Sequence, residues 1–203
     1  MDSRTGKIIF AELNFSCNKV YTMKFTSLLI SFIFLFTASQ NLLASSQIPT
    51  CNYDFNGLKP CTTEKIGPGF SVELKIVPDA ISRKRKNLSK LIVRRDGTTH
   101  QLVITPDTTL MKRDQGYISF TDINFDGIAD LAITTSFGVA NLYLDYWVYM
   151  PKEKQYKKIG NYSVFELGPK NKTLSNTTKI NAATYETVKY KWDAYKLVRV
   201  SKK

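Results

Sequence analysis

The sequence predicts a mainly β protein, built as an antiparallel β-sandwich or as blade-like sheets, and three observations support this fold class. The 203 residues include 12 Phe and 11 Tyr beside many Val, Ile and Thr residues, all of which favour strands. Strand-like segments recur at a spacing of about 8–12 residues, with polar turns between them. In addition, Asp96-Gly97 separates two apolar-rich segments, which is the strongest short-range signal of a β-hairpin.

The expected elements follow one another along the second two-thirds of the chain. Strands are expected at 70–77, in the two arms of 91–104, and at 117–120, 131–137, 141–150, 156–159, 162–167, 184–192 and 194–200. A short helix is expected only near residues 80–90, and 168–178 is expected to be a loop. His100 is the only histidine, with no serine, cysteine or second histidine near it in the sequence, and we expect it on a strand surface.

Residues 23–44 have the order of a secretory signal peptide. One positive charge at Lys24 precedes an apolar run that ends at Phe36, and small and polar residues then lead to Ala44. The run is too short for a membrane-spanning helix, which needs about 20 apolar residues. We therefore expect a periplasmic or secreted protein that is cleaved near Ala44 and does not span the membrane.

This interpretation makes Met23 the expected start of translation and residues 1–22 an over-extended gene prediction. Residues 45–203 would then form a single β-rich domain. Cys17 falls in the doubtful prefix, which leaves Cys51 and Cys61 as the two cysteines of the exported chain. An even cysteine count in an exported protein indicates a disulfide.

The charge balance is strongly basic, with 29 Lys and Arg residues against 17 Asp and Glu residues. Removing residues 1–44 changes the formal charge only from +12 to +10, because this segment holds four bases and two acids. Such a charge attracts anionic membranes, wall polymers and acidic proteins. No nucleic-acid-binding module or zinc-finger spacing is present, so nucleic acid is not expected as a partner. The basic run 83–86 is either an anion-binding patch or a solvated loop.

Residues 122–130 (DINFDGIAD) concentrate acidic side chains around one glycine. Counted from Asp122 as position 1, further side-chain oxygens stand at position 3 (Asn124), position 5 (Asp126) and position 9 (Asp130). Position 6 is Gly127, and position 7 offers the carbonyl of Ile128. Positions 1, 3, 5 and 7 supply oxygen ligands in EF-hand calcium loops, where glycine at 6 permits the sharp turn. This spacing predicts a Ca²⁺ site, because clustered carboxylates repel one another unless a cation lies between them.

The loop differs from an EF-hand at position 12, where Ile133 replaces the bidentate glutamate. The β-branched residues that follow predict a strand–loop–strand site rather than a helix after the loop. Asp130 would then complete the calcium shell, together with water. The alternative is a set of Asx turns, in which Asp, Asn and Gly shape a loop without metal.

Beyond this loop, the chain resembles a known family. DINFDGIADL resembles the calcium loops of FG-GAP and VCBS-type repeats. The ordered segments YISFTDINFDGIADL, FGVANLYLDYWVY, LGPKNKTLSNTT and AATYETVKYKW, within about residues 115–199, resemble a family of periplasmic proteins with a single calcium loop. Members of this family are immunity proteins against peptidoglycan-cleaving toxins, and they share their fold with an inhibitor of invertebrate-type lysozymes. The resemblance implies an inhibitor of a peptidoglycan hydrolase or toxin; the alternative is a calcium-stabilised envelope- or wall-binding module.

Such inhibitors insert a rigid loop into the substrate cleft of a hydrolase, and residues 136–143 (SFGVANLY) are the expected loop. Its working residues would be Ser136, Gly138, Asn141 and Tyr143, and calcium binding a few residues earlier would hold its base. A plain turn is the alternative interpretation.

We do not expect an enzyme, because the sequence has no GxSxG or HExxH motif and no glycine-rich phosphate loop. The alternative is calcium-supported hydrolysis, with Glu153, Glu166 and Glu186 converging in space.

Overall fold

The computed structural model describes residues 50–137 and 140–202, without the side chains of 201 and 202. These residues belong to the unit Ser45–Lys203, which is distinct from Met1–Ala44. The expectations for 1–22 and for the signal peptide at 23–44 therefore lie outside the described residues. Within the described residues the fold is mainly β and antiparallel, as predicted, and the one helical element is the 3₁₀ turn η1 (Pro169–Asn171).

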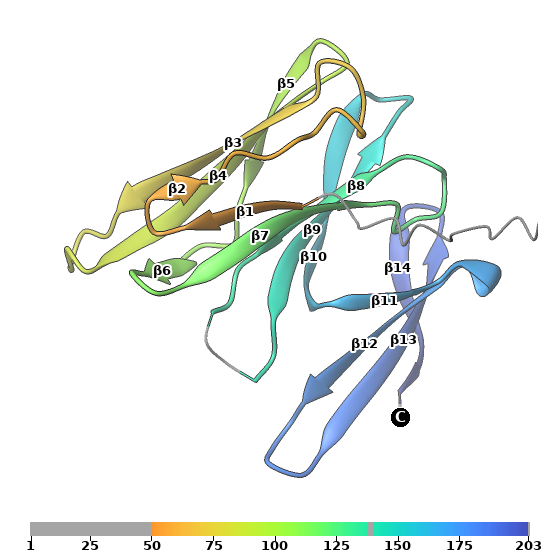
Figure 1. Ribbon diagram of the computed structural model, residues 1–203. Coiled ribbons are helices and arrows are strands. Elements are labelled where there is room, and N and C mark those ends of the chain that lie inside the picture. Colours follow the sequence, from red (N-terminus) through yellow and green to blue (C-terminus); the bar gives the residue numbers. More distant parts are fainter. Residues whose placement is uncertain (1–49, 138–139, 203) are drawn as a thin grey trace, which may run out of the picture. The chain divides into compact units, whose positions relative to one another are not determined.

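Three antiparallel sheets make up the domain (Figure 1). The central sheet has the strand order β10 (Gln155–Ser163), β9 (Tyr143–Met150), β8 (Asp130–Thr134), β7 (Gln115–Thr121), β1 (Thr50–Asp54), β2 (Gly57–Leu58). The β3–β6 sheet contains β3 (Ser71–Pro78), β4 (Arg85–Arg95), β5 (Thr98–Val103), β6 (Thr109–Met111). The β11–β14 sheet contains β11 (Phe165–Gly168), β12 (Thr173–Lys179), β13 (Tyr185–Asp193), β14 (Lys196–Lys202).

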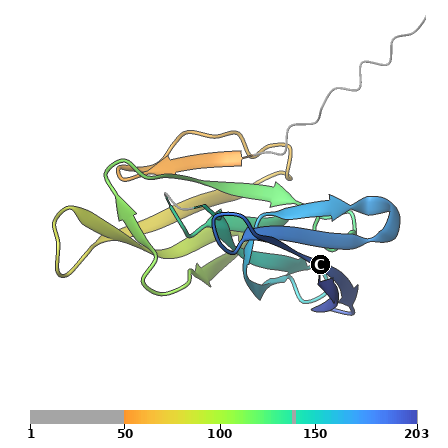
Figure 2. The same ribbon diagram turned by 90° about the horizontal axis from the view of Figure 1, so that it is seen from below.

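The central sheet contributes to two hydrophobic cores, one on each face. Figure 1 and Figure 2 show the three sheets from two directions. On β8, Leu131 and Ile133 pack toward the β3–β6 sheet, whereas Ala132 points to the core shared with β11 and β12. Because successive side chains of a strand point to opposite faces, a strand covered on both faces has every residue buried. All five residues of β8 are buried, and so are seven of the eight residues of β9.

The hairpin predicted at Asp96-Gly97 is present between β4 and β5. Both turn residues have positive φ angles, 50° and 74°, as a two-residue hairpin turn with the twist of its strands requires. The short helix expected near residues 80–90 is wrong, because β4 already begins at Arg85. Pairing with both β3 and β6 overrides the weak local signal there.

The expectation of a loop at 168–178 is also wrong for most of that segment. It contains η1 and then β12, a polar strand that pairs with both β11 and β13. The sequence TLSNTTK carries few apolar residues, but Leu174 and Asn176 point inward and are buried. Partners on both sides and β-branched threonines are enough to hold this strand in the sheet.

The predicted disulfide between Cys51 and Cys61 is confirmed. The two Cα atoms are 5.2 Å apart and the bond closes a loop around β2. Cys51 is fully buried and belongs to the core on the β3–β6 side, so the bond fixes the start of the central sheet.

Candidate functional site

The acidic loop joins β7 to β8 and is folded around its own side chains. One carboxylate oxygen of Asp122 accepts the backbone N–H of Gly127 at 2.8 Å and the other accepts that of Asp126 at 3.1 Å. The amide oxygen of Asn124 accepts the same Asp126 N–H at 3.2 Å, so oxygens from positions 1 and 3 converge on one point. Gly127 has a φ angle of 88°, a left-handed conformation that glycine adopts without strain.

Asp126 and Asp130, the other two side-chain positions, are bound in different ways. Asp126 accepts the N–H of Ile128 at 2.8 Å and the side-chain amide of Asn124 at 2.8 Å. Asp130 is the first residue of β8 and is only 1% exposed, and its oxygens accept the N–H groups of Ile123 at 3.0 Å and Tyr149 at 2.9 Å. The loop thus forms the Asx-type turns that the alternative interpretation expected, with a buried carboxylate behind them.

The electrostatic surroundings of Asp130 disfavour an uncompensated negative charge. Burial raises the pKa of this carboxyl to about 7, against the lowering effect of its two backbone hydrogen bonds. The nearby carboxylates of Asp126 and Asp122 raise its pKa further. Burial and these neighbours therefore favour a proton or a cation at Asp130 near neutral pH.

The donor set of the loop suits a hard cation. Carboxylate, amide and carbonyl oxygens are ligands of Ca²⁺, and the described residues of the loop offer no nitrogen or sulfur ligand that zinc would prefer. In the described part of the chain, however, no three Asp, Glu, His or Cys side chains gather closely enough to hold a metal as they are placed. The predicted calcium ligands, with the Ile128 carbonyl among them, therefore stay a prediction.

Two long-range contacts clamp the acidic loop between the outer sheets. From the end of β4, Arg95 Nη1 donates to the carbonyl oxygen of Ala129 at 2.8 Å, and its guanidinium stacks over the Tyr149 ring at 4.0 Å. From β13, Trp192 Nε1 donates to the carbonyl oxygen of Ile123 at 2.7 Å. The sequence did not point to Arg95 or Trp192, since neither lies near the loop in the chain.

The only histidine lies close to this clamp. His100 is half-buried on β5, and its ring packs edge-on against Tyr156 and Tyr149 rather than standing free on a strand surface. Its Nε2 is buried without a hydrogen-bond partner among the described residues. Burial and the neighbouring Arg95 hold the pKa of His100 below its usual value, so the ring is neutral at pH 7.

The predicted inhibitory loop between β8 and β9 is anchored at its base. Thr135 N–H donates to the carbonyl oxygen of Tyr143 at 2.8 Å, and the Phe137 ring lies edge-on to Tyr53, with 6.2 Å between ring centroids. The side chain of Asn141 forms two hydrogen bonds with the backbone of Lys179, at 2.9 and 2.7 Å. Asn141 therefore holds the loop against β12 instead of presenting an amide to a partner.

The remaining predicted loop residues have different surroundings. Ser136 and Tyr143 are half-buried, and Gly138 lies outside the described residues. The acidic loop and the 136–143 loop leave opposite ends of β8 (Figure 1). A cation in the acidic loop would therefore not touch the base of the 136–143 loop, contrary to the expectation from sequence distance. Phe137 and Asn141 anchor the base instead.

A buried carboxylate that the sequence did not reveal lies beside this loop base. Asp145 on β9 has no exposed surface and accepts both the N–H and the hydroxyl of Thr105 at 2.6 Å. Lys158 Nζ and the side-chain amide of Asn161 complete its partners at 2.8 and 2.9 Å. Asn161 also donates to the Thr135 hydroxyl at 2.8 Å, so this network fixes the position where the 136–143 loop begins.

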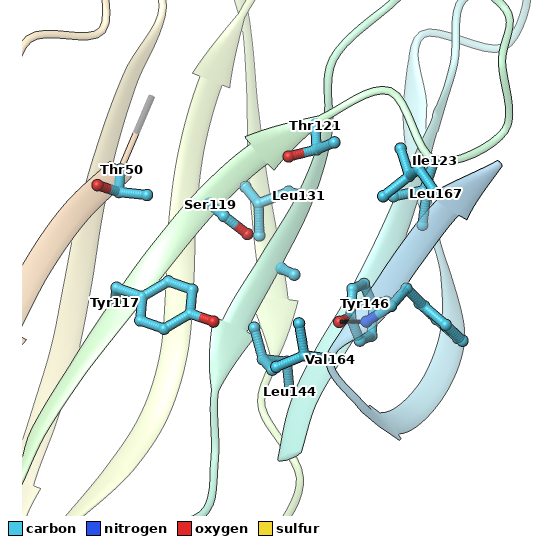
Figure 3. A pocket seen from close by; sticks show the side chains of 12 residues that line it. Thr50, Tyr117, Ser119, Thr121, Ile123, Leu131, Leu144, Tyr146, Val164 and Leu167 are labelled. Carbon is cyan, nitrogen blue, oxygen red and sulfur yellow. Dashed lines mark hydrogen bonds between the residues drawn. The ribbon is translucent and has the colours of Figure 1, made fainter. Parts of the chain in front are cut away.

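An apolar cavity of about 270 Å³ lies between the central sheet and β11 (Figure 3). Leu131, Leu144 and Tyr146 line its interior, and the hydroxyl-bearing side chains of Ser119 and Thr121 lie along β7. None of the residues that line this cavity is charged, so the lining offers no acid or base for catalysis.

Comparison with known proteins gives no relative: no protein-family model, no curated protein and no solved structure matches the chain. Within residues 50–137 and 140–202, no helix has the length and apolar character that crossing a membrane requires.

Proposed function

We propose that the protein is an exported, calcium-binding inhibitor that blocks a peptidoglycan hydrolase or toxin and has no catalytic activity of its own. The calcium ligands would be the side chains of Asp122, Asn124, Asp126 and Asp130 with the carbonyl of Ile128. Calcium would neutralise the acidic loop and stiffen the junction between β7 and β8. The 136–143 loop would enter the substrate cleft of the hydrolase.

The observation that carries this proposal is the anchoring of the 136–143 loop. Hydrogen bonds from Thr135, the packing of Phe137 and the double hydrogen bond of Asn141 fix both sides of the loop before any partner binds. A loop whose two sides are already held in the free protein loses less conformational entropy on binding, which favours inhibition by loop insertion.

Two features support a binding protein rather than an enzyme. The only histidine packs its ring against Tyr149 and Tyr156 beside Arg95, a setting that supplies no nucleophile for it to activate. The buried carboxylate of Asp145 is fully engaged by four hydrogen bonds, which leaves it unsuited to proton transfer.

A hydrolase assay tests the inhibitor proposal. The purified protein should reduce the digestion of peptidoglycan by hydrolases encoded beside its gene or by invertebrate-type lysozyme. Tyr143→Ala should weaken inhibition at least tenfold, because a large side chain at the centre of an interface contributes roughly 2 kcal/mol or more. Asn171→Ala, at an exposed position in η1, is the matched control and should inhibit normally.

The net positive charge makes the choice of hydrolase important, since a basic enzyme would be repelled during approach. An acidic hydrolase should therefore be inhibited more strongly at low ionic strength. Sedimentation with purified wall sacculi in the absence of any inhibition would contradict the inhibitor proposal and support the wall-binding alternative.

A further inference from the structure

Two turns far apart in the sequence form one basic surface at the end of the β3–β6 sheet. One turn joins β3 to β4 and the other joins β6 to β7, and both views place the first turn at the same end as β6 (Figure 1 and Figure 2). Lys84 in the first turn and Arg85 at the start of β4 line a single hollow. On its other side lie Met111 at the end of β6 and the turn residues Lys112 and Arg113. Pairing of Arg85 with Met111 between β4 and β6 joins the turns directly. We call this surface the basic end.

Acidic side chains hold the two turns in shape. Asp79 accepts the N–H groups of Ser82 at 2.7 Å and Ile81 at 2.9 Å, and these hydrogen bonds hold the pKa of Asp79 below its usual value. Asp114 accepts the N–H of Met111 at 2.7 Å. Both carboxylates are engaged by backbone groups, so the turns have a defined conformation.

Four basic side chains of this surface lack an ion-pair partner among the described residues, whereas Arg85 pairs with Asp79 at 3.5 Å. Arg83, Lys84, Lys112 and Arg113 are all exposed, and within the described residues none of them forms an ion pair. Lys86 differs, because its Nζ donates to the carbonyl oxygen of Phe55 at 2.8 Å and stabilises the fold. Four unpaired cations therefore project from two adjacent turns.

Large apolar side chains are exposed among these cations. Ile81 is 89% exposed, the highest value among the large hydrophobic residues that the structure describes, and Met111 is 56% exposed. An anionic polysaccharide attracts the charges but offers no apolar layer for such aliphatic side chains. A lipid surface satisfies both features, because phosphate headgroups attract Lys and Arg while apolar side chains enter the boundary of the acyl region.

We propose that the basic end docks the protein on an anionic lipid membrane, with Arg83, Lys84, Lys112 and Arg113 at the headgroups and with Ile81 and Met111 inserted below them. The contact is peripheral and reversible. It does not depend on calcium binding or on hydrolase inhibition, and it would hold the protein at the membrane while the 136–143 loop remains available to a partner.

Vesicle sedimentation tests this proposal. Protein purified from expression of the full chain, with its N-terminus determined by mass spectrometry, is mixed with vesicles of phosphatidylglycerol and phosphatidylcholine or of phosphatidylcholine alone. Binding should require phosphatidylglycerol and weaken with salt. Each basic residue of the set changed to Gln should weaken binding about fivefold, which corresponds to ~1 kcal/mol per basic residue near an anionic surface.

Variants with equal charge separate the basic end from the overall charge of the protein. The quadruple variant Arg83→Gln, Lys84→Gln, Lys112→Gln, Arg113→Gln should lose binding. Its control neutralises four exposed lysines elsewhere, Lys152→Gln, Lys157→Gln, Lys170→Gln, Lys191→Gln, and should keep most of the binding. Equal loss in both variants would overturn the proposal, since total charge would then explain the attraction.

The apolar pair distinguishes lipid from other anionic polymers. Ile81→Ser with Met111→Ser should weaken vesicle binding about tenfold, because two partly inserted side chains leave the lipid. The same variant should bind the soluble polysaccharide polygalacturonate as the parent protein does. Unchanged vesicle binding in this double variant would overturn the lipid proposal.

Discussion

Asp130 is the residue on which the behaviour of the acidic loop depends most. Its carboxylate is buried and receives only backbone N–H groups, while the charges that reach it most strongly come from two other carboxylates. Without a cation, a pKa of about 7 leaves this carboxyl partly protonated near neutral pH in the folded protein. In the unfolded chain the same aspartate is ionised above about pH 4.

This difference predicts an unusual dependence of stability on pH when calcium is removed. A carboxyl whose folded pKa of about 7 exceeds its unfolded value stabilises the fold below about pH 4, and this contribution is lost as the pH rises to 7. The loss for Asp130 is at most about 4 kcal/mol. This pH dependence can be measured by chemical denaturation in a chelator between about pH 5 and pH 8, a range that includes the folded pKa. The free energy of unfolding should fall as the pH rises.

Asp130→Asn is the control for this measurement. The amide of this variant cannot ionise, so the decline should be absent, although the amide oxygen can accept only one of the two N–H groups that bind Asp130. His100 acts in the opposite direction, since its lowered pKa makes the fold more stable as the pH rises toward 6.5, and it is present in both proteins. Parallel pH profiles for the parent and the variant would show that Asp130 is ionised without a cation.

At the scale of the elements, two strand ends from different sheets hold the acidic loop in place. The end of β4 reaches the Ala129 carbonyl through Arg95, and β13 reaches the Ile123 carbonyl through Trp192. Arg95 lies 34 positions before the loop residue that it contacts, and Trp192 lies 69 positions after its own. The geometry of the loop depends on tertiary structure as much as on its own nine residues.

Trp192→Phe tests this support. The phenyl ring keeps the aromatic contact with the core but leaves the Ile123 carbonyl without its donor, which costs about 1–2 kcal/mol of stability. If calcium binds the loop, its affinity should fall several-fold as well. Tyr190→Phe on the same strand removes a hydroxyl that forms no hydrogen bond within residues 50–137 and 140–202, and it should change neither quantity. Equal calcium affinity in both variants would mean that β13 does not support the loop.

The parts of the fold that depend on local chemistry could be predicted from the sequence. Asp96-Gly97 marks its hairpin because that turn needs two positive φ angles, and Gly127 marks the sharp bend of the acidic loop for the same reason. The disulfide followed from counting the cysteines of the expected exported chain. These signals need no knowledge of the distant chain.

The parts that depend on distant partners could not be predicted. β12 has a polar sequence and becomes a strand because β11 and β13 lie on either side of it. Asn141 looked like an exposed turn residue, but it binds the backbone of Lys179, 38 positions away. The network around Asp145 joins three segments that carry no recognisable motif.

At the scale of the whole molecule, the signal-peptide pattern of residues 23–44 predicts cleavage near Ala44. Expression of the full chain in a bacterial host should therefore yield an exported protein that starts at or next to Ser45. Intact mass spectrometry of the periplasmic fraction measures this directly. A cytoplasmic product that retains Lys24 would contradict export and, with it, the proposed encounter with a peptidoglycan hydrolase.

Isothermal titration of the protein with calcium is the most direct test of the central claim, which is that the acidic loop binds this ion. The parent should bind one Ca²⁺ per chain and melt at a higher temperature in about millimolar calcium. Asp122→Asn with Asp126→Asn should abolish both effects, whereas Asp107→Asn with Asp193→Asn, two acids outside the loop, should preserve them. No heat of binding and an unchanged melting temperature in the parent would contradict the claim.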